Sequence, residues 1–173
     1  KIILAGRLLK DKGIDDYLTL SKNFNQKNVN FFLAGDLDIG NPKSLSQNEL
    51  DIIKEDSSLN YLGYIDLQKE LHNYDLLLSL SDHEGFSRVL LEAMYVGLFV
   101  VAYKNNGTKY IDGFDNTILL NSKNKNSLED TINKFLTQEI FISKQNRKQI
   151  EISYSTQKVA SQFANIYNEK NEG

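Results

Sequence analysis

The chain has 173 residues, of which 40% are hydrophobic and 25% charged, a composition typical of one globular domain with a sizeable core, which excludes a disordered or fibrous chain. A formal net charge of −3 argues against a nucleic-acid partner held by a basic surface. The sequence contains no cysteine and only two histidines, His72 and His83, so we expect no disulfide, no metal site and no cofactor.

The chain opens on a short apolar run that predicts a buried strand. Lys1 to Ala5 (K-I-I-L-A) leads into Arg7, and a helix is predicted from about Ile14 to Phe24, after the turn K-D-K-G. Ligand-binding residues of an open parallel sheet lie at the carboxyl ends of its strands, which is the position of Arg7, with Lys12 close by in the loop. We therefore expect both cations to contact a phosphate. The alternative is a solvated loop of mixed charge.

Apolar runs and amphipathic stretches alternate along the remaining chain. Further strands are predicted at Val29 to Ala34, Leu59 to Leu62, Tyr74 to Leu80, Phe99 to Tyr103 and Thr117 to Asn121. The predicted helices are Leu45 to Asp56, Leu67 to Asn73, one that begins after Ser87, Ser127 to Thr137, Ile140 to Ile152 and Ser155 to Glu169. The alternation predicts a single α/β domain over residues 1–173, with a Rossmann-like, doubly wound parallel sheet of about six strands and helices on both faces.

Several classes of protein do not fit the sequence. It has neither G-x-G-x-x-G after a strand nor G-x-x-x-x-G-K-[ST], which argues against a dehydrogenase or a P-loop NTPase. No apolar run approaches the roughly eighteen residues of a membrane span, and no signal peptide opens the chain, so we expect a cytoplasmic location. The basic residues of the helix at 140–152 (Lys144, Arg147 and Lys148) are expected to be solvated. The alternative is that they face the inner surface of a membrane.

The stretch from Asp82 to Ala102 (D-H-E-G-F-S-R-V-L-L-E-A-M-Y-V-G-L-F-V-V-A) is the chemically suggestive part of the chain. Ser87 is expected to cap the N-terminus of a helix, with Phe86 and Leu91 in the positions of a hydrophobic staple. Gly85 just upstream lets the backbone approach a ligand closely. This stretch therefore predicts a loop-to-helix junction that could hold a ligand.

The first turn of this predicted helix contains Arg88, Val89 and Leu90, whose amides have no acceptor inside the helix and could bind a phosphate at the positive end of the helix dipole. Two glutamates frame the same junction, Glu84 in the loop and Glu92 in the second turn. Carboxylates suit sugar hydroxyls because they accept charged hydrogen bonds. The alternative is that Glu92 pairs with Arg88 on the helix surface and that Glu84 is solvated.

Two glutamates eight apart inside E-G-F-S-x-x-L-L-E-A-M-x-x-G-x-x-V-V-A resemble the signature of the retaining GT-B glycosyltransferases of family four (glycosyl transferases group 1), where the segment binds a nucleotide-sugar donor. The stretches A-G-R-L-L-K-D-K-G, F-F-L-A-G-D, Y-L-G-Y-I and I-D-G-F-D-N stand in that family's order, and the resemblance covers Lys1 to about Leu136. It implies the C-terminal, donor-binding half of a GT-B enzyme. The start on a core strand fits a fragment that lacks the N-terminal, acceptor-binding domain, and the helix at 154–171 is expected to cross back to that domain.

The resemblance implies roles for individual residues. Both cations of the family's G-R-x-x-x-x-K-G contact the donor diphosphate, which assigns that contact to Arg7 and Lys12. Glu92 would hold the ribose and Glu84 the sugar. The implied catalytic residues are Glu84, Arg7 and Lys12, because the cations would stabilise the charge that grows on the diphosphate. The implied donor-binding residues are Arg7, Lys12, Tyr64, Ile65, Glu84, Gly85, Phe86, Ser87, Val89, Leu90 and Glu92.

Two of these residues and two departures from the family pattern need separate mention. Tyr64 and Ile65 follow an L-G pair that lies along the base in the family, and the alternative is a surface Tyr64 and a core Ile65. After Asp36 a longer loop stands where the family usually has a second glycine. This loop either changes which residues cover the nucleotide or is a variation of the surface. The acid that often follows the family's glycine-rich turn is absent, with Tyr110 in its approximate place. No role is therefore assigned to residues 105–108.

The function implied by the resemblance is the transfer of a hexosyl group, with retention, from a nucleoside diphosphate sugar to a glycan or lipid-linked acceptor. A UDP-sugar is favoured, in bacterial glycan assembly, with peripheral membrane association as a further expectation for the full-length enzyme. We expect the chain alone to be inactive, because half of the cleft is missing. The alternatives are a nucleotide-sugar epimerase of the same architecture and a non-catalytic module that binds nucleotide sugars.

Overall fold

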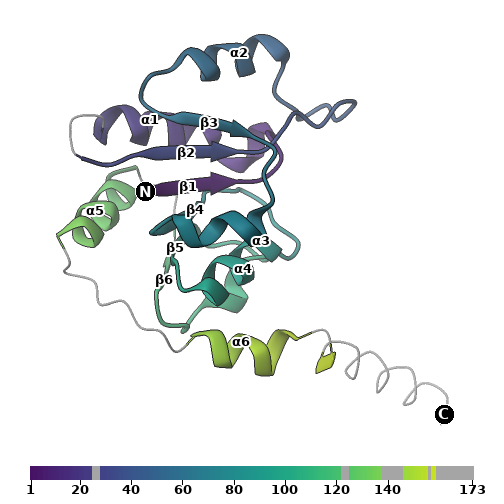
Figure 1. Ribbon diagram of the computed structural model, residues 1–173, viewed down its shortest axis with the longest axis vertical. Helices are drawn as coiled ribbons and strands as arrows, with labels where there is room; N and C mark the ends of the chain where they lie inside the picture. The colour runs from purple at the N-terminus through teal and green to yellow at the C-terminus, as the bar shows by residue number, and fades with distance from the viewer. Residues whose placement is uncertain (25–27, 122–124, 138–145, 156, 159–173) are drawn as a thin grey trace.

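An all-parallel sheet forms the centre of the computed structural model, which describes residues 1–24, 28–121, 125–137, 146–155 and 157–158 (Figure 1). The strands in the described part of the chain are β1 (Ile2–Ala5), β2 (Phe31–Ala34), β3 (Asn60–Gly63), β4 (Leu76–Ser79), β5 (Phe99–Tyr103) and β6 (Thr117–Leu120). Their order is β3-β2-β1-β4-β5-β6. The sheet therefore grows outward in both directions from β1 and β4, and ligands of such sheets bind beyond the carboxyl ends of the strands where the order reverses.

Helices connect these strands. They are α1 (Ile14–Phe24), α2 (Gln47–Glu55), α3 (Leu67–Glu70), α4 (Arg88–Val96), α5 (Lys125–Leu136) and α6 (Asn146–Tyr154). Short 3₁₀ turns are η1 (Lys10–Lys12), η2 (Leu71–Asn73) and η3 (Lys109–Ile111). None of the described helices is long and apolar enough to cross a membrane.

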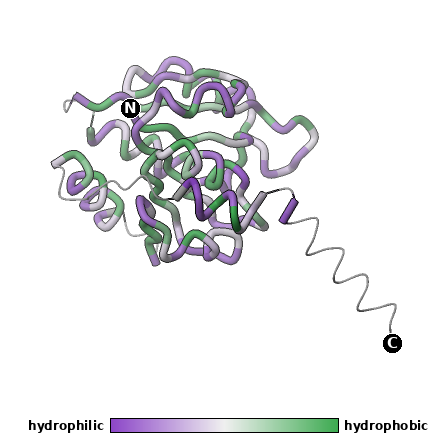
Figure 2. The backbone as a smooth tube through the Cα atoms, turned by 60° about the horizontal axis from the view of Figure 1, so that its bottom comes forward, coloured by the Kyte–Doolittle hydropathy of each residue, from purple (hydrophilic) through white to green (hydrophobic). Residues whose placement is uncertain are grey.

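The four inner strands, β1, β2, β4 and β5, are buried on both faces, and their successive side chains point alternately into two cores. Ile2 and Leu4 of β1 belong to a core cluster that includes buried residues of α1, α2 and α5, whereas Ile3 belongs to a second cluster with η2, α4 and α6. Hydrophobic and hydrophilic residues alternate along the helices in Figure 2, as expected of amphipathic helices that cover a sheet. The predicted layers, with helices on both faces, are confirmed.

Most predicted elements lie within a few residues of their observed bounds. Helix α1 and strand β5 have the predicted bounds, and β2 begins at Phe31 rather than at Val29. Helix α6 begins at Asn146 within the described residues, and 140–145 lie outside them. The predicted last helix, and with it the crossing segment at 154–171, lies almost entirely outside the described residues.

Candidate functional site

Two adjoining cavities lie at the carboxyl edge of the sheet, beyond the point where the strand order reverses. Their volumes are about 260 and about 270 Å³, and both are lined by the residues that follow β1, namely Gly6 and Arg7, and by Leu67 at the start of α3. The first cavity extends over the ends of β2 and β3, and the second extends over the end of β4 and the start of α4. The segments after β1, β3 and β4 that the sequence analysis singled out therefore converge on one crevice.

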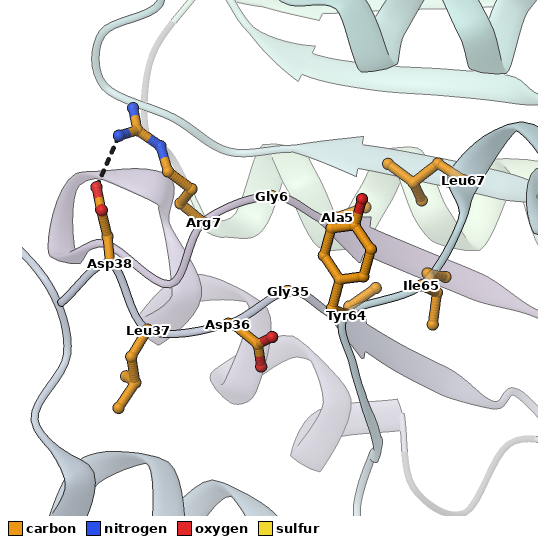
Figure 3. Close-up of a pocket in the computed structure, with 11 residues that line it drawn as sticks. Ala5, Gly6, Arg7, Gly35, Asp36, Leu37, Asp38, Tyr64, Ile65 and Leu67 are labelled. Carbon is orange, nitrogen blue, oxygen red and sulfur yellow. Dashed lines mark hydrogen bonds and ion pairs between the residues drawn. The ribbon is translucent and has the colours of Figure 1, made fainter.

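The first cavity brings together Arg7, Tyr64 and Ile65 (Figure 3). Tyr64 is 82% exposed, whereas Ile65 is partly buried and packs against the second core cluster. The geometry of the two residues is therefore compatible with the alternative of a surface tyrosine and a core isoleucine. Their contact with a base stays a prediction.

Arg7 is held by the loop that departs from the family pattern. Its Nη1 atom lies 2.7 Å from Oδ2 of Asp38, and Figure 3 shows the guanidinium turned toward Asp38 and away from Tyr64. The Nδ2 atom of Asn41 donates to the same carboxylate oxygen at 2.8 Å. The hydrogen bond from Asn41 and the ion pair with Arg7 hold the pKa of Asp38 below its usual value. Sequence analysis missed this counter-ion, although the longer loop after Asp36 was the signal that could have found it.

In the second cavity the predicted diphosphate ligand and the predicted sugar ligand are paired with each other. Lys12 Nζ lies 2.6 Å from Glu84 Oε1, and the two side chains are only 16% and 18% exposed. The hydroxyl of Ser81 donates to the same oxygen at 2.9 Å. The turn that carries Lys12 can lie against the end of β4 because Gly13 has no side chain: an added Cβ atom would lie 2.2 Å from the carbonyl oxygen of Leu80. A cation and an acid that are distant in the sequence thus form one polar cluster.

The start of α4 faces the same cavity, which is lined by Phe86, Ser87, Arg88 and Val89. Ser87 occupies the N-cap position as predicted, but its side chain makes no capping hydrogen bond. The first-turn amides, which have no acceptor within an α-helix, are therefore not capped by Ser87 and could bind an anion. The side chain of Leu90 is fully buried, so only its backbone amide could contact a ligand.

Phe86 lines the second cavity, whereas the neighbouring Gly85 does not. Phe86 is 52% exposed and its ring stacks on Tyr110, with the ring centroids 4.6 Å apart. Phe86, which was predicted to pack against Leu91 as a hydrophobic staple, thus stacks on a residue of η3. Gly85 is exposed and does not line either cavity, and an added Cβ atom would meet no atom within 4 Å. The packing of the described residues does not require glycine at this position.

Glu92 lies outside the two cavities at the sheet edge. It lines a third cavity of about 360 Å³ between α3, α4 and α6, together with apolar residues such as Leu91 and Ile150. Its Oε1 atom lies 3.5 Å from Nη2 of Arg88, whose side chain is 79% exposed. The surface pairing that the sequence left open as an alternative is therefore present, and the ribose contact of Glu92 stays a prediction.

A segment to which the sequence analysis assigned no role lies directly behind the β4–α4 loop (residues 80–87). We call residues 105–110, between β5 and the middle of η3, the support segment. The hydroxyl of Tyr110 donates to the carbonyl oxygen of Ser87, and Nδ2 of Asn105 donates to the carbonyl oxygen of Ser81 at 3.0 Å. The absence of the family's acid at Tyr110 was the only sequence signal that pointed to this segment.

Comparison with known proteins gives the family. The family model described as Glycosyl transferases group 1 matches residues 1–156, and the chain belongs to this family. No curated protein sequence matches the chain at a significant level. Within the described residues, no group of three or more histidine, aspartate or glutamate side chains could hold a metal ion.

Solved glycosyltransferase structures share the fold. Anabaena HepE in complex with UDP-glucose is 21% identical with a TM-score of 0.80, and the match covers 97% of this chain and 48% of HepE. Sucrose-phosphate synthase from Thermosynechococcus elongatus is 20% identical with a TM-score of 0.81, covering 99% of this chain and 45% of the synthase. TarM is 24% identical with a TM-score of 0.77, covering 97% of this chain and 35% of TarM. The six-stranded sheet is thus the Rossmann-like fold of GT-B glycosyltransferases, and the chain spans less than half the length of each of these three proteins.

Proposed function

We propose that the chain is the donor-binding part of a retaining glycosyltransferase that moves a hexosyl group from a nucleoside diphosphate sugar, with UDP favoured, to a glycan or lipid-linked acceptor. The observation that carries this proposal is the crevice where the strand order reverses, in which Arg7, Lys12 and the start of α4 face one space. Two cations and the positive end of a helix dipole suit a diphosphate. The family membership and the UDP-glucose complex of HepE support the nucleotide sugar.

The donor would lie across both cavities. Its diphosphate would occupy the second cavity near Lys12 and Arg7, and Arg7 lines the first cavity as well. Its nucleoside would extend into the first cavity, toward Tyr64 and Ile65. When the diphosphate attracts Lys12, Glu84 would lose its ion-pair partner and become available as an acceptor for sugar hydroxyls. The two cations and the first-turn amides would then stabilise the charge that develops on the leaving diphosphate.

The ribose and the acceptor require further elements. Glu92 lies about one turn further along α4 from Arg88, so it would have to leave its pair with Arg88 to hold the ribose. The acceptor would bind to a second domain, because the chain spans less than half of its structural neighbours. We therefore expect the chain to bind the donor without transferring its sugar.

Titration calorimetry of the purified chain with UDP, GDP and ADP tests the proposal and identifies the base. We expect one of them to bind, and the double variant Arg7→Ala/Lys12→Ala to bind it at least tenfold more weakly, because a charged hydrogen bond contributes about 1.5–3 kcal/mol. Lys22→Ala is a matched control, since Lys22 of α1 pairs with Asp56 at the end of α2 and neither residue lines the crevice. Failure of all three nucleotides to bind, or equal binding by the double variant, would contradict the proposal.

A further inference from the structure

The support segment (residues 105–110) contacts the β4–α4 loop at three places. At the start of the loop, Asn105 donates to the carbonyl oxygen of Ser81. In the middle, Gly107 lies so close to Glu84 that an added Cβ atom would be 2.2 Å from the Glu84 carbonyl oxygen. The end of the loop, at Ser87, is held by Tyr110. The loop that carries the predicted sugar ligand is thus backed along most of its length.

The support segment is itself held rigidly at the end of β5. Thr108 is fully buried, and its hydroxyl donates to the carbonyl oxygen of Tyr103 and accepts from the amide of Asn105, both at 2.9 Å. The amide of Gly107 donates to the side-chain oxygen of Asn105 at 2.9 Å. Because Asn105, Gly107 and Thr108 are hydrogen-bonded to one another and Thr108 is tied to the end of the fully buried strand β5, this segment can serve as a fixed surface for the neighbouring loop.

Tyr110 makes the contact that is nearest to the start of α4. Its hydroxyl donates to the carbonyl oxygen of Ser87, the N-cap residue, and its ring stacks on Phe86. Burial of the ring raises the pKa of Tyr110, and Tyr154 and Glu84 nearby raise it further, so the hydroxyl stays a proton donor at neutral pH. An ionised carboxylate in this place could only accept hydrogen bonds and would repel a carbonyl oxygen. A neutral donor therefore suits this position.

The direction of a helix N-terminus depends on the residue that precedes it. The N-cap carbonyl of Ser87 lies in the same peptide plane as the amide of Arg88, so a hydrogen bond that fixes this carbonyl orients that amide directly. The amides of Val89 and Leu90 follow it in helical geometry, so their direction is set with it. The stacked ring of Phe86 adds a second contact on the same side, and Tyr154 of α6 packs on both rings. The start of α4 is thus held by a hydrogen bond and aromatic contacts from Tyr110 and Tyr154, which themselves line neither of the two cavities at the sheet edge.

We propose that Tyr110 is a positioning residue that aims the start of α4 at the donor diphosphate. This inference rests on the proposed function, because it assigns a diphosphate to the crevice. Tyr110 itself lines neither of the two cavities at the sheet edge. It acts through Ser87 and Phe86, so its removal should weaken contacts to the phosphates and leave contacts to the nucleoside unchanged.

The test compares Tyr110→Phe with Tyr103→Phe, using the nucleoside diphosphate that binds the wild-type chain most tightly and the corresponding nucleoside. Tyr110→Phe keeps the stacked ring and removes only the hydroxyl. Tyr103→Phe also removes one tyrosine hydrogen bond, to Asp16 at 3.1 Å, in the core cluster of the opposite face. We expect Tyr110→Phe to lower the affinity for the diphosphate about three- to tenfold, as for one neutral hydrogen bond, and the affinity for the nucleoside not at all. Tyr103→Phe should change neither affinity.

A second pair of variants covers the case in which Tyr110→Phe fails to fold. Gly107→Ala should separate the support segment from the loop and lower the affinity for the diphosphate by at least as much. Asn106→Ala is its control. The Asn106 side chain is exposed and accepts a hydrogen bond from Lys109, which belongs to the support segment and not to the β4–α4 loop. Amide hydrogen exchange at Arg88 to Leu90 should show less protection by the bound diphosphate in both test variants than in the wild type.

The outcomes separate the two proposals. If the wild-type chain binds no nucleoside diphosphate, the proposed function fails and this inference fails with it. If the wild-type chain binds a diphosphate and folded Tyr110→Phe or Gly107→Ala binds it equally well, the inference alone is wrong. Equal losses for the diphosphate and the nucleoside would also overturn it, because they would indicate a general structural role.

Discussion

At the scale of single residues, the side chains predicted to bind the donor are already paired with charges of the opposite sign. Lys12 and Glu84 form a pair that is largely shielded from water, since their side chains are only 16% and 18% exposed. Arg7, which pairs with Asp38, has a side chain that is 64% exposed. Water screens an exposed ion pair strongly and a shielded one weakly. The two pairs should therefore respond differently to substitution.

Glu84→Gln should destabilise the chain by about 1–2 kcal/mol, because it leaves the shielded Lys12 ammonium without a counter-charge while keeping an amide oxygen as acceptor. Urea denaturation followed by circular dichroism measures the change. Glu92→Gln is the matched control: its partner Arg88 is 79% exposed, so the change should stay below about 0.5 kcal/mol. Equal effects of the two substitutions would show that the Lys12–Glu84 pair is screened like a surface pair.

Asp38→Asn should tighten the binding of a nucleoside diphosphate about two- to fivefold, the range expected for an exposed ion pair. In the wild type, a bound phosphate has to share the Arg7 guanidinium with the Asp38 carboxylate, which also repels the phosphate. Calorimetry at low and high salt measures the gain, which should shrink as salt screens the charges. Weaker binding by Asp38→Asn would mean that Asp38 orients Arg7 for the ligand and does not compete with it.

At the scale of elements, the loop that carries Asp38 is anchored at its far end by the start of α2. The amide of Leu45 donates to the carbonyl oxygen of Leu8 at 2.9 Å, and Ser46 then caps α2. The Ser46 side chain accepts from the amide of Glu49, and Oε2 of Glu49 accepts from the amide and the hydroxyl of Ser46. This reciprocal cap fixes the direction in which the loop returns to the helix.

Ser46→Ala should lower the free energy of unfolding by about 1 kcal/mol at neutral pH, because it leaves a first-turn amide without an acceptor. The hydrogen bonds from the backbone and side chain of Ser46 hold the pKa of Glu49 below its usual value. A carboxylate whose pKa is lower in the folded than in the unfolded chain stabilises the fold at pH values above its unfolded-state pKa. This stabilisation is lost as the pH falls through its folded-state pKa. Ser46→Ala keeps the backbone hydrogen bond to Glu49 and loses only the one from the hydroxyl. The difference between Ser46→Ala and wild type should therefore be somewhat smaller at pH 3.5, below the ordinary glutamate pKa of about 4.3, than at neutral pH. Urea denaturation at the two pH values measures it, and an unchanged difference would contradict the role of the carboxylate.

At the scale of the whole molecule, the crevice joins segments that follow β1, β2, β3 and β4. A ligand that contacts all of them links parts of the sheet on both sides of the point where the strand order reverses. A ligand that binds only the folded chain stabilises it by an amount set by its concentration and its dissociation constant. The crevice therefore predicts an effect of the ligand on global unfolding.

A nucleoside diphosphate present at a hundred times its dissociation constant should raise the free energy of unfolding by about 2.7 kcal/mol and raise the unfolding temperature accordingly. Differential scanning fluorimetry of the chain with and without the nucleotide measures the shift. At the same nucleotide concentration the gain should fall to about 1.4 kcal/mol or less in Arg7→Ala/Lys12→Ala, which binds at least tenfold more weakly, and persist in full in Lys22→Ala. A shift of equal size in the double variant would locate the binding site elsewhere.

The sequence by itself determined which segments form helices and strands and that they build an α/β domain, because these properties depend on residues close to one another in the chain. The apolar runs at Ile2–Ala5 and Phe99–Tyr103 and the amphipathic period of Ile14–Phe24 are local patterns, and each of these elements formed as predicted. The position of Arg7 directly after a strand similarly placed it at the carboxyl edge, since parallel strands end at the same side of the sheet. Ser87 was predicted correctly as the N-cap residue, but not its missing side-chain hydrogen bond.

Only the tertiary structure decided which side chains meet. Lys12 and Glu84 are 72 residues apart and Arg7 and Asp38 are 31 apart, so their pairing depends on strand order and loop packing, which no local pattern contains. Glu92 faces the third cavity because the rotation of α4 is set by the packing of its buried face on the sheet. Tyr110 reaches Ser87 because β4 and β5 are neighbours, so that the segments following them lie side by side. A hydrogen bond or ion pair needs atoms within a few ångströms, and the folded chain alone fixes distances of that size between segments far apart in the sequence.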